Sequence, residues 1–244
     1  KLFYNKLSNN KMRDRYSKKS ESILSIKNDN NSIRVLCFTP SYNRHKMIRG
    51  CIRDILNQTY NNIHHAVNVT YDNDNNNINK IFDDLNYKNL NIQYFKNTNQ
   101  HENYMNCYRN IDTDNFDIFV KIDDDEIYKS NYIKTIVDFF IKHKDVDIVS
   151  SKFKYQLNGH KIYTGLYHNL GGNPPNIDFN FSSTFAFNKK AFNIIKSLNG
   201  NKFEDIIWRN EWAKNKLNHC TIDNTENVIW YIHGKNISTS NFFK

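Results

Sequence analysis

The sequence predicts an α/β fold, a mostly parallel central sheet with helices on both faces. Short apolar runs alternate with segments of helical periodicity from about residue 33 to residue 149, which is typical of repeated βα units. An acidic cluster directly follows one of the apolar runs. Hydrophobic residues make up 39% of the 244 positions and aromatic residues 14%, enough for a sizeable core, so a disordered chain is excluded.

The first half of the chain carries the βα alternation. Residues 33–38 form an apolar run ended by Thr39-Pro40, which predicts a buried strand. Apolar positions from Met47 to Leu56 fall at helical spacing and predict an amphipathic helix ending near Asn57. The same patterns predict strands at 66–69, 92–95, 118–122 and 146–149, and helices around 81–85, 104–111 and 130–140, the last of them capped by Ser130.

The second half is richer in strand patterns. Strands are expected at 153–157, 162–167, 181–187 and 228–232, and helices at 189–197 and 204–215. Residues 1–31 are polar and basic and predict a peripheral arm, either solvated or touching anionic lipid. We expect residues 32–244 to form a single domain.

The formal net charge of +9 attracts phosphate, whether in nucleic acid, anionic lipid or nucleotide. Asn and Lys are both abundant, as AT-rich codons would produce, so the charge does not choose a partner. No apolar run approaches the roughly 20 residues that span a bilayer. Because the sequence begins at Lys1 rather than at Met, we expect it to be a trimmed form of a longer protein.

The cysteines predict free thiols. Cys37, Cys51, Cys107 and Cys220 form no C-x-x-C pair, and their spacings fit no zinc pattern. Cys37 lies in an apolar run and Cys51 on an apolar helix face, so both are expected in the core. Free thiols favour a reducing compartment, and a cytoplasmic location is therefore expected.

The strongest functional signal is Asp123-Asp124-Asp125-Glu126, directly after the strand predicted at 118–122. Adjacent carboxylates repel one another unless a cation neutralises them. Mn²⁺ and Mg²⁺ prefer carboxylate oxygens and keep positions open for phosphate oxygens. A metal held here would neutralise charge on a leaving phosphate. The alternative is a solvated acidic turn or an adventitious calcium loop.

Several segments in order carry a family resemblance. The sequence Thr39-Pro40-Ser41-Tyr42-Asn43-Arg44 follows the first strand, Asn57-Gln58-Thr59-Tyr60 follows the first helix, and the acidic cluster and Phe203-Glu204-Asp205 come later. This series resembles the family 2 glycosyltransferases of the GT-A fold, most clearly over residues 33–140. The resemblance implies a GT-A fold, a nucleotide-sugar donor (UDP-type favoured), Mn²⁺ or Mg²⁺, and inverting transfer to a hydroxyl of a glycan or glycolipid, as in polysaccharide biosynthesis. Residues 32–130 would bind the donor and residues 131–244 the acceptor.

The resemblance also implies site residues. Asp125 would ligate the metal, Asp123 would lie nearer the ribose and the metal's water shell, and Asp124 could exchange roles with them. His233 could be a further metal ligand or a structural histidine, and Lys235 could bind the diphosphate. Where the family often has V-D-D-G-S, this chain has Asn68-Val69-Thr70-Tyr71-Asp72-Asn73-Asp74, so Asp72 or Asp74 would contact the base. The remaining donor-site candidates are Thr39, Pro40, Tyr42, Arg44 and Asn103, although Tyr42 could instead serve packing.

Asp205 is the candidate general base. Inverting transfer needs a proton removed from the acceptor hydroxyl, and a positioned carboxylate can accept it. The family pattern places this base at the Asp of the Glu204-Asp205 pair. The alternative is that Asp205 only favours the start of a helix. Glu204 and Asp178 are the next candidates, and Gly171-Gly172-Asn173-Pro174-Pro175 could form a lid.

Other functions fit the sequence less well. The chain has no G-x-G-x-x-G, no P-loop ending and no G-x-S-x-G, which argues against a dehydrogenase, a P-loop NTPase and an α/β-hydrolase. A sugar nucleotidyltransferase would have a Gly-rich loop after the first strand. A basic nucleic-acid-binding module would gather its basic residues on one surface, and here they are spread along the chain, so no nucleic-acid partner is expected. A non-catalytic sugar-nucleotide-binding relic is disfavoured by the intact acidic motifs.

Overall fold

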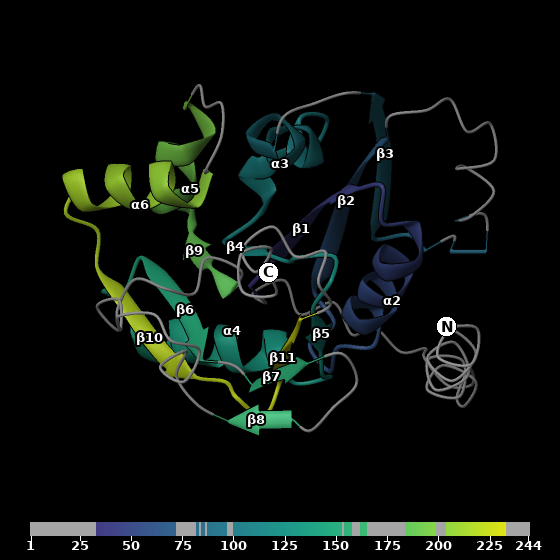
Figure 1. The fold of residues 1–244 in the computed structure, drawn as a ribbon. Helices are drawn as coiled ribbons and strands as arrows, with labels where there is room; N and C mark the ends of the chain where they lie inside the picture. Colours follow the sequence, from purple (N-terminus) through teal and green to yellow (C-terminus); the bar gives the residue numbers. More distant parts are fainter. Residues whose placement is uncertain are drawn as a thin grey trace, which may run out of the picture.

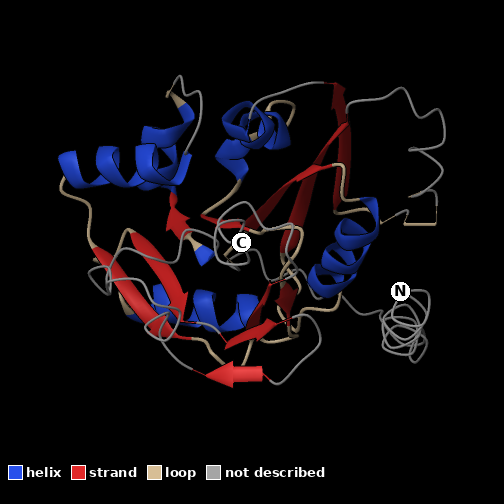
Figure 2. Cartoon of the chain, viewed as in Figure 1, coloured by secondary structure: helices blue, strands red, loops and turns tan. Residues whose placement is uncertain are grey.

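The computed structural model describes residues 33–71, 82, 84–85, 87–96, 100–152, 154–157, 162–164, 184–198 and 204–232. Within these ranges it confirms the α/β class, with two sheets and helices packed around them (Figure 2). Among the described residues, no helix combines the length and the apolar character needed to cross a bilayer. The basic arm at 1–31 and the helix expected around 81–85 lie wholly or partly outside the described residues.

The larger sheet has the strand order β10-β6-β9-β4-β1-β2-β3. Four neighbouring strands are parallel: β4 (Ile118–Lys121), β1 (Val35–Tyr42), β2 (Ile63–Tyr71) and, at the edge, β3 (Leu90–Lys96). β9 (Ala186–Asn188) runs antiparallel between β4 and β6 (Ile148–Lys152), and β10 (His219–Asp223) pairs in parallel with β6. The sheet is therefore mostly parallel, as predicted, with one reversed strand near its middle.

The strand order reverses beside β1. After β1 the chain builds β2 and β3 on one side and then returns to place β4 on the other side. In open α/β sheets such a reversal leaves a crevice at the carboxyl ends of the strands, where ligands bind. The acidic cluster follows β4 at this point.

Helices cover both faces of this sheet (Figure 1). On one face, α2 (His45–Leu56) and α4 (Tyr132–Lys142) pack on the odd-numbered residues of β1, including Val35 and Cys37. On the other face, α3 (Gln100–Tyr108), α5 (Lys189–Lys196) and α6 (Glu204–Lys214) pack on its even-numbered residues, Leu36 and Phe38. This division follows from the period-2 alternation of side chains along a strand.

A smaller sheet joins β5 (Ile127–Tyr128), β11 (Val228–Ile232), β7 (Lys154–Leu157) and β8 (Ile162–Thr164). β11 is antiparallel to β5 and parallel to β7, and β7 is antiparallel to β8. Because β5 begins directly after Glu126, this sheet anchors the far end of the acidic loop. A 3-10 helix at Thr113–Asn115 precedes β4.

The prediction that Thr39-Pro40 ends the first strand is wrong, because β1 continues to Tyr42. Pro40 lies opposite Asn68 of β2. The backbone of Phe38 bonds toward β4, since its carbonyl accepts the Ile122 N–H at 3.1 Å. The backbone nitrogen of Pro40, two residues further along, points to the same side of β1 as the backbone of Phe38. The pairing of β1 with β4 has ended there, because its last pair is at Phe38. The missing N–H of Pro40 therefore breaks no ladder hydrogen bond, and the strand tolerates the proline.

The prediction that Ser130 caps the helix expected at 130–140, which is α4, is also wrong. The N-cap residue of α4 is Asn131, and its side chain makes no capping bond. Instead Gln58 accepts the Ile133 N–H at 2.9 Å and donates to the Lys129 carbonyl at 2.8 Å. Gln58 of the Asn57-Gln58-Thr59-Tyr60 motif, just after α2, thus supplies hydrogen-bond partners to backbone groups at the start of α4.

Other boundaries shift by a few residues. The helix expected at 104–111 is α3, which begins at Gln100, and the strand expected at 146–149 is β6, which begins at Ile148. Only the end of the segment expected as a strand at 181–187 is described as strand, where it forms the start of β9. Cys37, Cys51 and Cys107 are buried free thiols and Cys220 is a partly buried one, as expected.

Candidate active site

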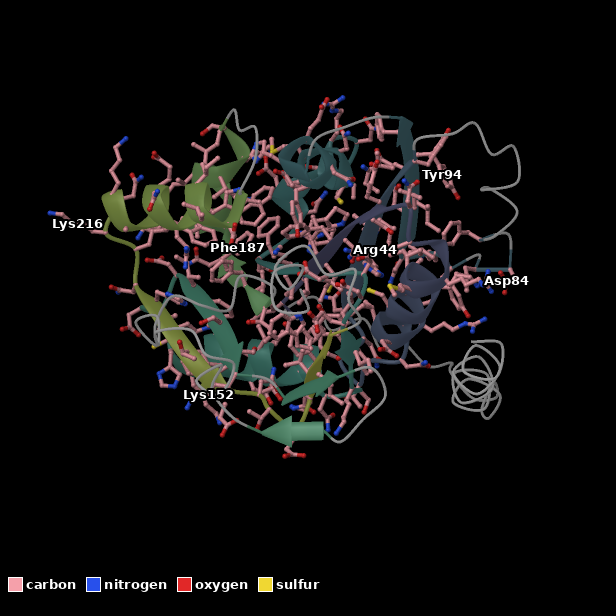
Figure 3. All side chains as sticks on the ribbon, in the orientation of Figure 1. Arg44, Asp84, Tyr94, Lys152, Phe187 and Lys216 are labelled. Carbon is pink, nitrogen blue, oxygen red and sulfur yellow. The ribbon has the colours of Figure 1, made fainter. Side chains whose placement is uncertain are left out.

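The acidic cluster lies in the turn between β4 and β5, beside the end of β1. Arg44, which follows β1, lies near the middle of the molecule in Figure 3. The turn is tied to three elements at once: β1, the start of α2, and α3. A further bond comes from the other end of α2, where the Asp54 carboxylate accepts the Tyr128 N–H at 3.0 Å.

Asp124 points toward the end of β1. Its side chain is only 4% exposed, and it accepts hydrogen bonds from the Ser41 hydroxyl at 2.6 Å and from Arg44 Nη1 at 2.8 Å. Burial raises the pKa of Asp124 to about 7, and the Arg44 charge opposes that rise. Asp124 therefore anchors the loop to β1 and α2.

Asp123, Asp125 and Glu126 form the group that could hold a metal ion. Each offers a carboxylate oxygen, and these atoms lie within 4.8 Å of one another. A set of carboxylate oxygens is the donor chemistry that Mg²⁺ and Mn²⁺ prefer, so the residues fit such an ion. The structure brings together the two predicted ligands Asp123 and Asp125 and adds Glu126, whose role as a ligand was not predicted.

Two cations partly balance these acids. Arg44 Nη1 also lies 2.8 Å from Asp125 Oδ2, and Lys121 Nζ lies 3.4 Å from Asp123 Oδ1. Burial raises the pKa of Asp123, and the Lys121 charge opposes that rise. In these ion pairs three aspartates thus face two cations. With its carboxylates ionised, the loop carries a net negative charge that a divalent cation would offset.

The last residues of β1 and the turn after it present the predicted donor-site residues in different ways. Thr39 is buried and its hydroxyl bonds His65 Nε2 at 2.8 Å, whereas Tyr42 is 49% exposed. Asn43 takes a left-handed conformation with φ of 52°, which asparagine tolerates better than most residues. Its N–H bonds the Thr70 carbonyl at 3.1 Å. This turn at the end of β1 directs Arg44 to the acidic loop.

Helix α3 contributes a second group of polar side chains. Asn103 is buried and accepts a hydrogen bond from Asn68 of β2. The Tyr104 hydroxyl donates to Asp123 Oδ1 at 3.1 Å. Asn103 therefore lies beside the end of β2 and next to a residue that contacts the acidic loop.

Asp205 lies in the first turn of α6 and is partly buried. Helix α6 runs outward from the middle of the molecule, and Lys216, just beyond it, lies at the outer edge (Figure 3). Trp208, three residues after Asp205, packs edge-on to Tyr104 with ring centroids 5.3 Å apart. Because residues three apart share a helix face, Asp205 lies on the side of α6 that faces α3.

Some predicted site residues lie outside the described residues. These are Asp72, Asp74, His233 and Lys235, together with Asp178 and the glycine-proline loop at 171–175. Conversely, the structure identifies contacts of the acidic loop that sequence reasoning missed. They come from Ser41, Tyr104, Lys121 and Tyr128, of which the last accepts the Asp123 N–H at 2.9 Å. The period-2 pattern of β1 places Ser41 on the α2 face, but no local pattern indicates its partner.

Solved structures of a bacterial enzyme share this fold. TarS 1–349 of S. aureus in complex with UDP-GlcNAc matches with a TM-score of 0.63 and 14% identity, over 85% of this chain and 61% of that one. The same fragment without that ligand matches with a TM-score of 0.60 and 15% identity, over 82% of this chain and 60% of that one. The complex of that fragment with UDP matches with a TM-score of 0.56 and 16% identity, over 83% of this chain and 61% of that one. At this identity the likeness shows the GT-A-like fold, and the chain spans about three fifths of the TarS fragment.

The sequence comparison identifies the family. No curated protein matches the chain. The pattern of glycosyl transferase family 2 matches residues 37–206, which include most of β1, the acidic loop and Asp205. The matched range covers well over half of the chain and contains the motifs that carry the resemblance. The chain therefore belongs to glycosyl transferase family 2.

Proposed function

We propose that the protein is an inverting, metal-dependent glycosyltransferase that moves a sugar from a UDP-sugar to a hydroxyl of a glycan or glycolipid. The observation that carries the proposal is the group of three carboxylates within 4.8 Å at the end of β4, in a chain of glycosyl transferase family 2. The acidic loop is held by side chains from several elements, which favours a preorganised site.

Asp123, Asp125 and Glu126 are the residues that would hold Mn²⁺ or Mg²⁺. The ion would supply positive charge opposite the diphosphate of the leaving nucleotide. Arg44 already pairs with Asp125 and Asp124, and its guanidinium is a second source of positive charge at this edge of the sheet. We retain His233 as a further metal ligand and Lys235 as a diphosphate contact in the proposal.

The donor would lie across the carboxyl ends of β1 and β2. TarS was solved with UDP-GlcNAc and with UDP, and the shared fold supports a uridine nucleotide here as well. Exposed Tyr42 offers an aromatic face to the base. Asp72 or Asp74, which follow β2, would contact the base. Thr39, Pro40 and Asn103 would line the donor site.

Asp205 would act as the general base. Its placement is supported by Trp208, which packs on Tyr104, because Tyr104 bonds Asp123. The carboxylate would take the proton of the acceptor hydroxyl as that oxygen attacks the anomeric carbon from the face opposite the leaving nucleotide. This geometry inverts the configuration at the anomeric carbon.

We further propose a place for the enzyme in the cell. Assembly of a surface polysaccharide at the cytoplasmic face of the membrane would suit a nucleotide-sugar donor. The basic residues before Ile33 would then contact anionic lipid.

A thermal-unfolding screen tests the proposed function. The chain is heated with UDP, UDP-GlcNAc, other UDP-sugars, GDP or a single-stranded oligonucleotide, each with and without Mn²⁺. A ligand at a hundredfold excess over Kd adds about 2.7 kcal/mol, which for a domain of this size raises Tm by roughly 5–11 °C. We expect that rise with UDP or a UDP-sugar only when Mn²⁺ is present. A salt-dependent shift with the oligonucleotide, and none with UDP and Mn²⁺, would instead favour a nucleic-acid-binding module.

A further inference from the structure

Lys121 is a buried cation directly behind the acidic loop. It is the last residue of β4 and its side chain is only 4% exposed. Lysine is almost never fully buried unless it is paired. Its ammonium lies 3.4 Å from Asp123 Oδ1 and 5.1 Å from the centre of the Tyr104 ring. The cation therefore lies against both the carboxylate and the aromatic face.

Tyr104 reaches the same carboxylate oxygen. Its hydroxyl donates to Asp123 Oδ1 at 3.1 Å, and its ring is buried against Phe38 and Trp208. The Asp123 N–H in turn donates to the Tyr128 hydroxyl at 2.9 Å. Asp123 is thus held at its backbone and at one side-chain oxygen, and Oδ2 lies outside these contacts among the described residues.

We propose that Lys121 and Tyr104 are positioning residues that orient Asp123 for the divalent cation and the donor. The inference rests on the proposed function, because it assigns a task to residues behind its metal site. Groups that hydrogen-bond a metal ligand typically change metal affinity about 10- to 100-fold when they are removed. A side chain locked from behind also costs less entropy when it binds a ligand.

The change in metal affinity on removal of Lys121 distinguishes an orienting role from two simpler roles, charge repulsion and stabilisation of the fold. A positive charge close to a cation site repels the cation, so by charge alone the removal of Lys121 would tighten metal binding. If Lys121 only neutralises a buried aspartate to stabilise the fold, its removal would lower the melting temperature and leave metal affinity unchanged. If it orients Asp123, its removal weakens metal binding despite the lost repulsion.

The test compares Lys121→Met with wild type by titrating Mn²⁺ alone and following the free ion by electron paramagnetic resonance. Met removes the charge and keeps most of the length of the unbranched side chain, and so most of its packing on Tyr104. We expect the Mn²⁺ Kd to rise about 10- to 100-fold. Lys121→Arg keeps the charge and is expected to lie closer to wild type. The matched control is Lys190→Met, which removes a lysine 3.2 Å from the largely buried Asp147, on the α5 side of the molecule; its Mn²⁺ affinity should equal that of wild type.

Tyr104→Phe provides a second variant in case Lys121→Met does not fold. It removes one hydroxyl and keeps the buried ring, and it should also weaken Mn²⁺ binding. Mn²⁺ affinity that is unchanged or tighter in Lys121→Met would overturn the inference, as would unchanged affinity in Tyr104→Phe if only that variant folds. Failure of the wild type itself to bind Mn²⁺ would contradict the metal site of the proposed function as well.

Discussion

At the scale of single residues, the three consecutive aspartates of the acidic loop have different surroundings. Asp123 faces Tyr104 and Lys121, Asp124 faces Ser41 and Arg44, and Asp125 faces Arg44 beside Glu126. In this turn Asp124 points toward the end of β1, whereas the carboxylates of Asp123, Asp125 and Glu126 converge, so the three aspartates do not all meet one ligand. The structure thus separates an anchoring aspartate from two that can bind a cation.

Asp125→Asn should weaken Mn²⁺ binding at least about tenfold and leave the fold intact, because it removes a ligand charge while Arg44 keeps its pair with Asp124. Calorimetric titration with Mn²⁺ and thermal unfolding measure the two effects. Asp124→Asn is the matched variant: it weakens the bonds to Ser41 and Arg44 and should cost about 1–3 kcal/mol of stability. Equal Mn²⁺ affinity in Asp125→Asn and wild type would contradict this division of roles.

Asp205→Asn tests the base. The amide keeps the shape of the carboxylate but cannot accept the acceptor's proton, and general-base catalysis contributes about 10²- to 10⁴-fold. We expect kcat to fall by about that factor while UDP affinity and stability barely change. A normal rate would leave Asp205 as a helix-start residue and make Glu204 or Asp178 the next candidate. A loss of UDP binding together with turnover would instead place Asp205 in the donor site.

The sequence could predict the acidic motif but not the roles within it. An acidic run after an apolar strand is a local pattern that predicted a cation site, and the family resemblance placed the predicted ligands at Asp123 and Asp125. The partner of Asp124 is Ser41, 83 residues away, and no local pattern pairs them. Lys121 lies inside the strand pattern, where a lysine gives no sign that it is buried against an aspartate.

At the scale of helices and strands, the elements with a clear period were predictable. Helix α2 ends where its apolar spacing ends, and β2, β3 and β11 match their apolar runs to within a few residues. The smaller sheet was not predicted, because β5 has two residues and can form only by pairing with β11, a hundred positions later in the chain. Its pairing is a property of the tertiary structure, and the same holds for β10 beside β6.

The pairing of β1 with β2 predicts an acid-sensitive step in stability. His65 of β2 is buried and bonds Thr39 of β1, and burial, with a smaller contribution from His64, lowers the pKa of His65 from 6.5 to about 3. Between these values the unfolded chain binds a proton that the folded chain does not. Stability is therefore present above pH 6.5 and is lost as the pH falls toward 3, by up to roughly 5 kcal/mol.

Urea unfolding of wild type and His65→Gln from pH 7.5 to pH 4 measures this effect. Glutamine can keep a hydrogen bond to Thr39 but does not titrate. The contribution of Asp124, whose raised pKa acts in the opposite direction, is the same in both proteins and cancels from the difference. We expect the wild type to lose stability faster than the variant as the pH falls below 6.5. Parallel pH profiles would mean that His65 is not buried in its neutral form.

At the scale of the whole molecule, the hydrophobic core on the face of the larger sheet covered by α3, α5 and α6 joins β1 and α3 to α6. It contains Phe38 of β1, Tyr104 of α3, Phe187 of β9 and both tryptophans of α6. Both rings contact Phe187, but Trp208 also contacts Tyr104 and Phe38, whereas Trp212 also contacts Phe185. The two tryptophans lie about one turn apart and are almost fully buried, but only Trp208 touches a residue that bonds the acidic loop.

We expect substitution of Trp212 to lower stability more, and substitution of Trp208 to lower activity more. Trp212 Nε1 donates to the Ala191 carbonyl at 3.0 Å, whereas Trp208 Nε1 is buried without a hydrogen-bond partner among the described residues. Trp212→Phe removes this hydrogen bond and should cost about 0.5–1.5 kcal/mol more stability than Trp208→Phe, which removes none among the described residues. Trp208→Phe, however, loosens the contact between the start of α6 and Tyr104, and a misplacement of about 1 Å can cost up to 10²-fold in rate.

Thermal unfolding and kcat with a UDP-sugar donor, measured on both variants, decide the question. We expect Trp212→Phe to be the less stable protein and Trp208→Phe the slower enzyme, with UDP affinity close to that of wild type in both. Because the two orders are reversed, a general loss of folded protein cannot produce the pattern. If activity instead falls in proportion to stability in both variants, the core only stabilises the molecule, and the path from Asp205 through Trp208 and Tyr104 to Asp123 does not set the geometry of transfer.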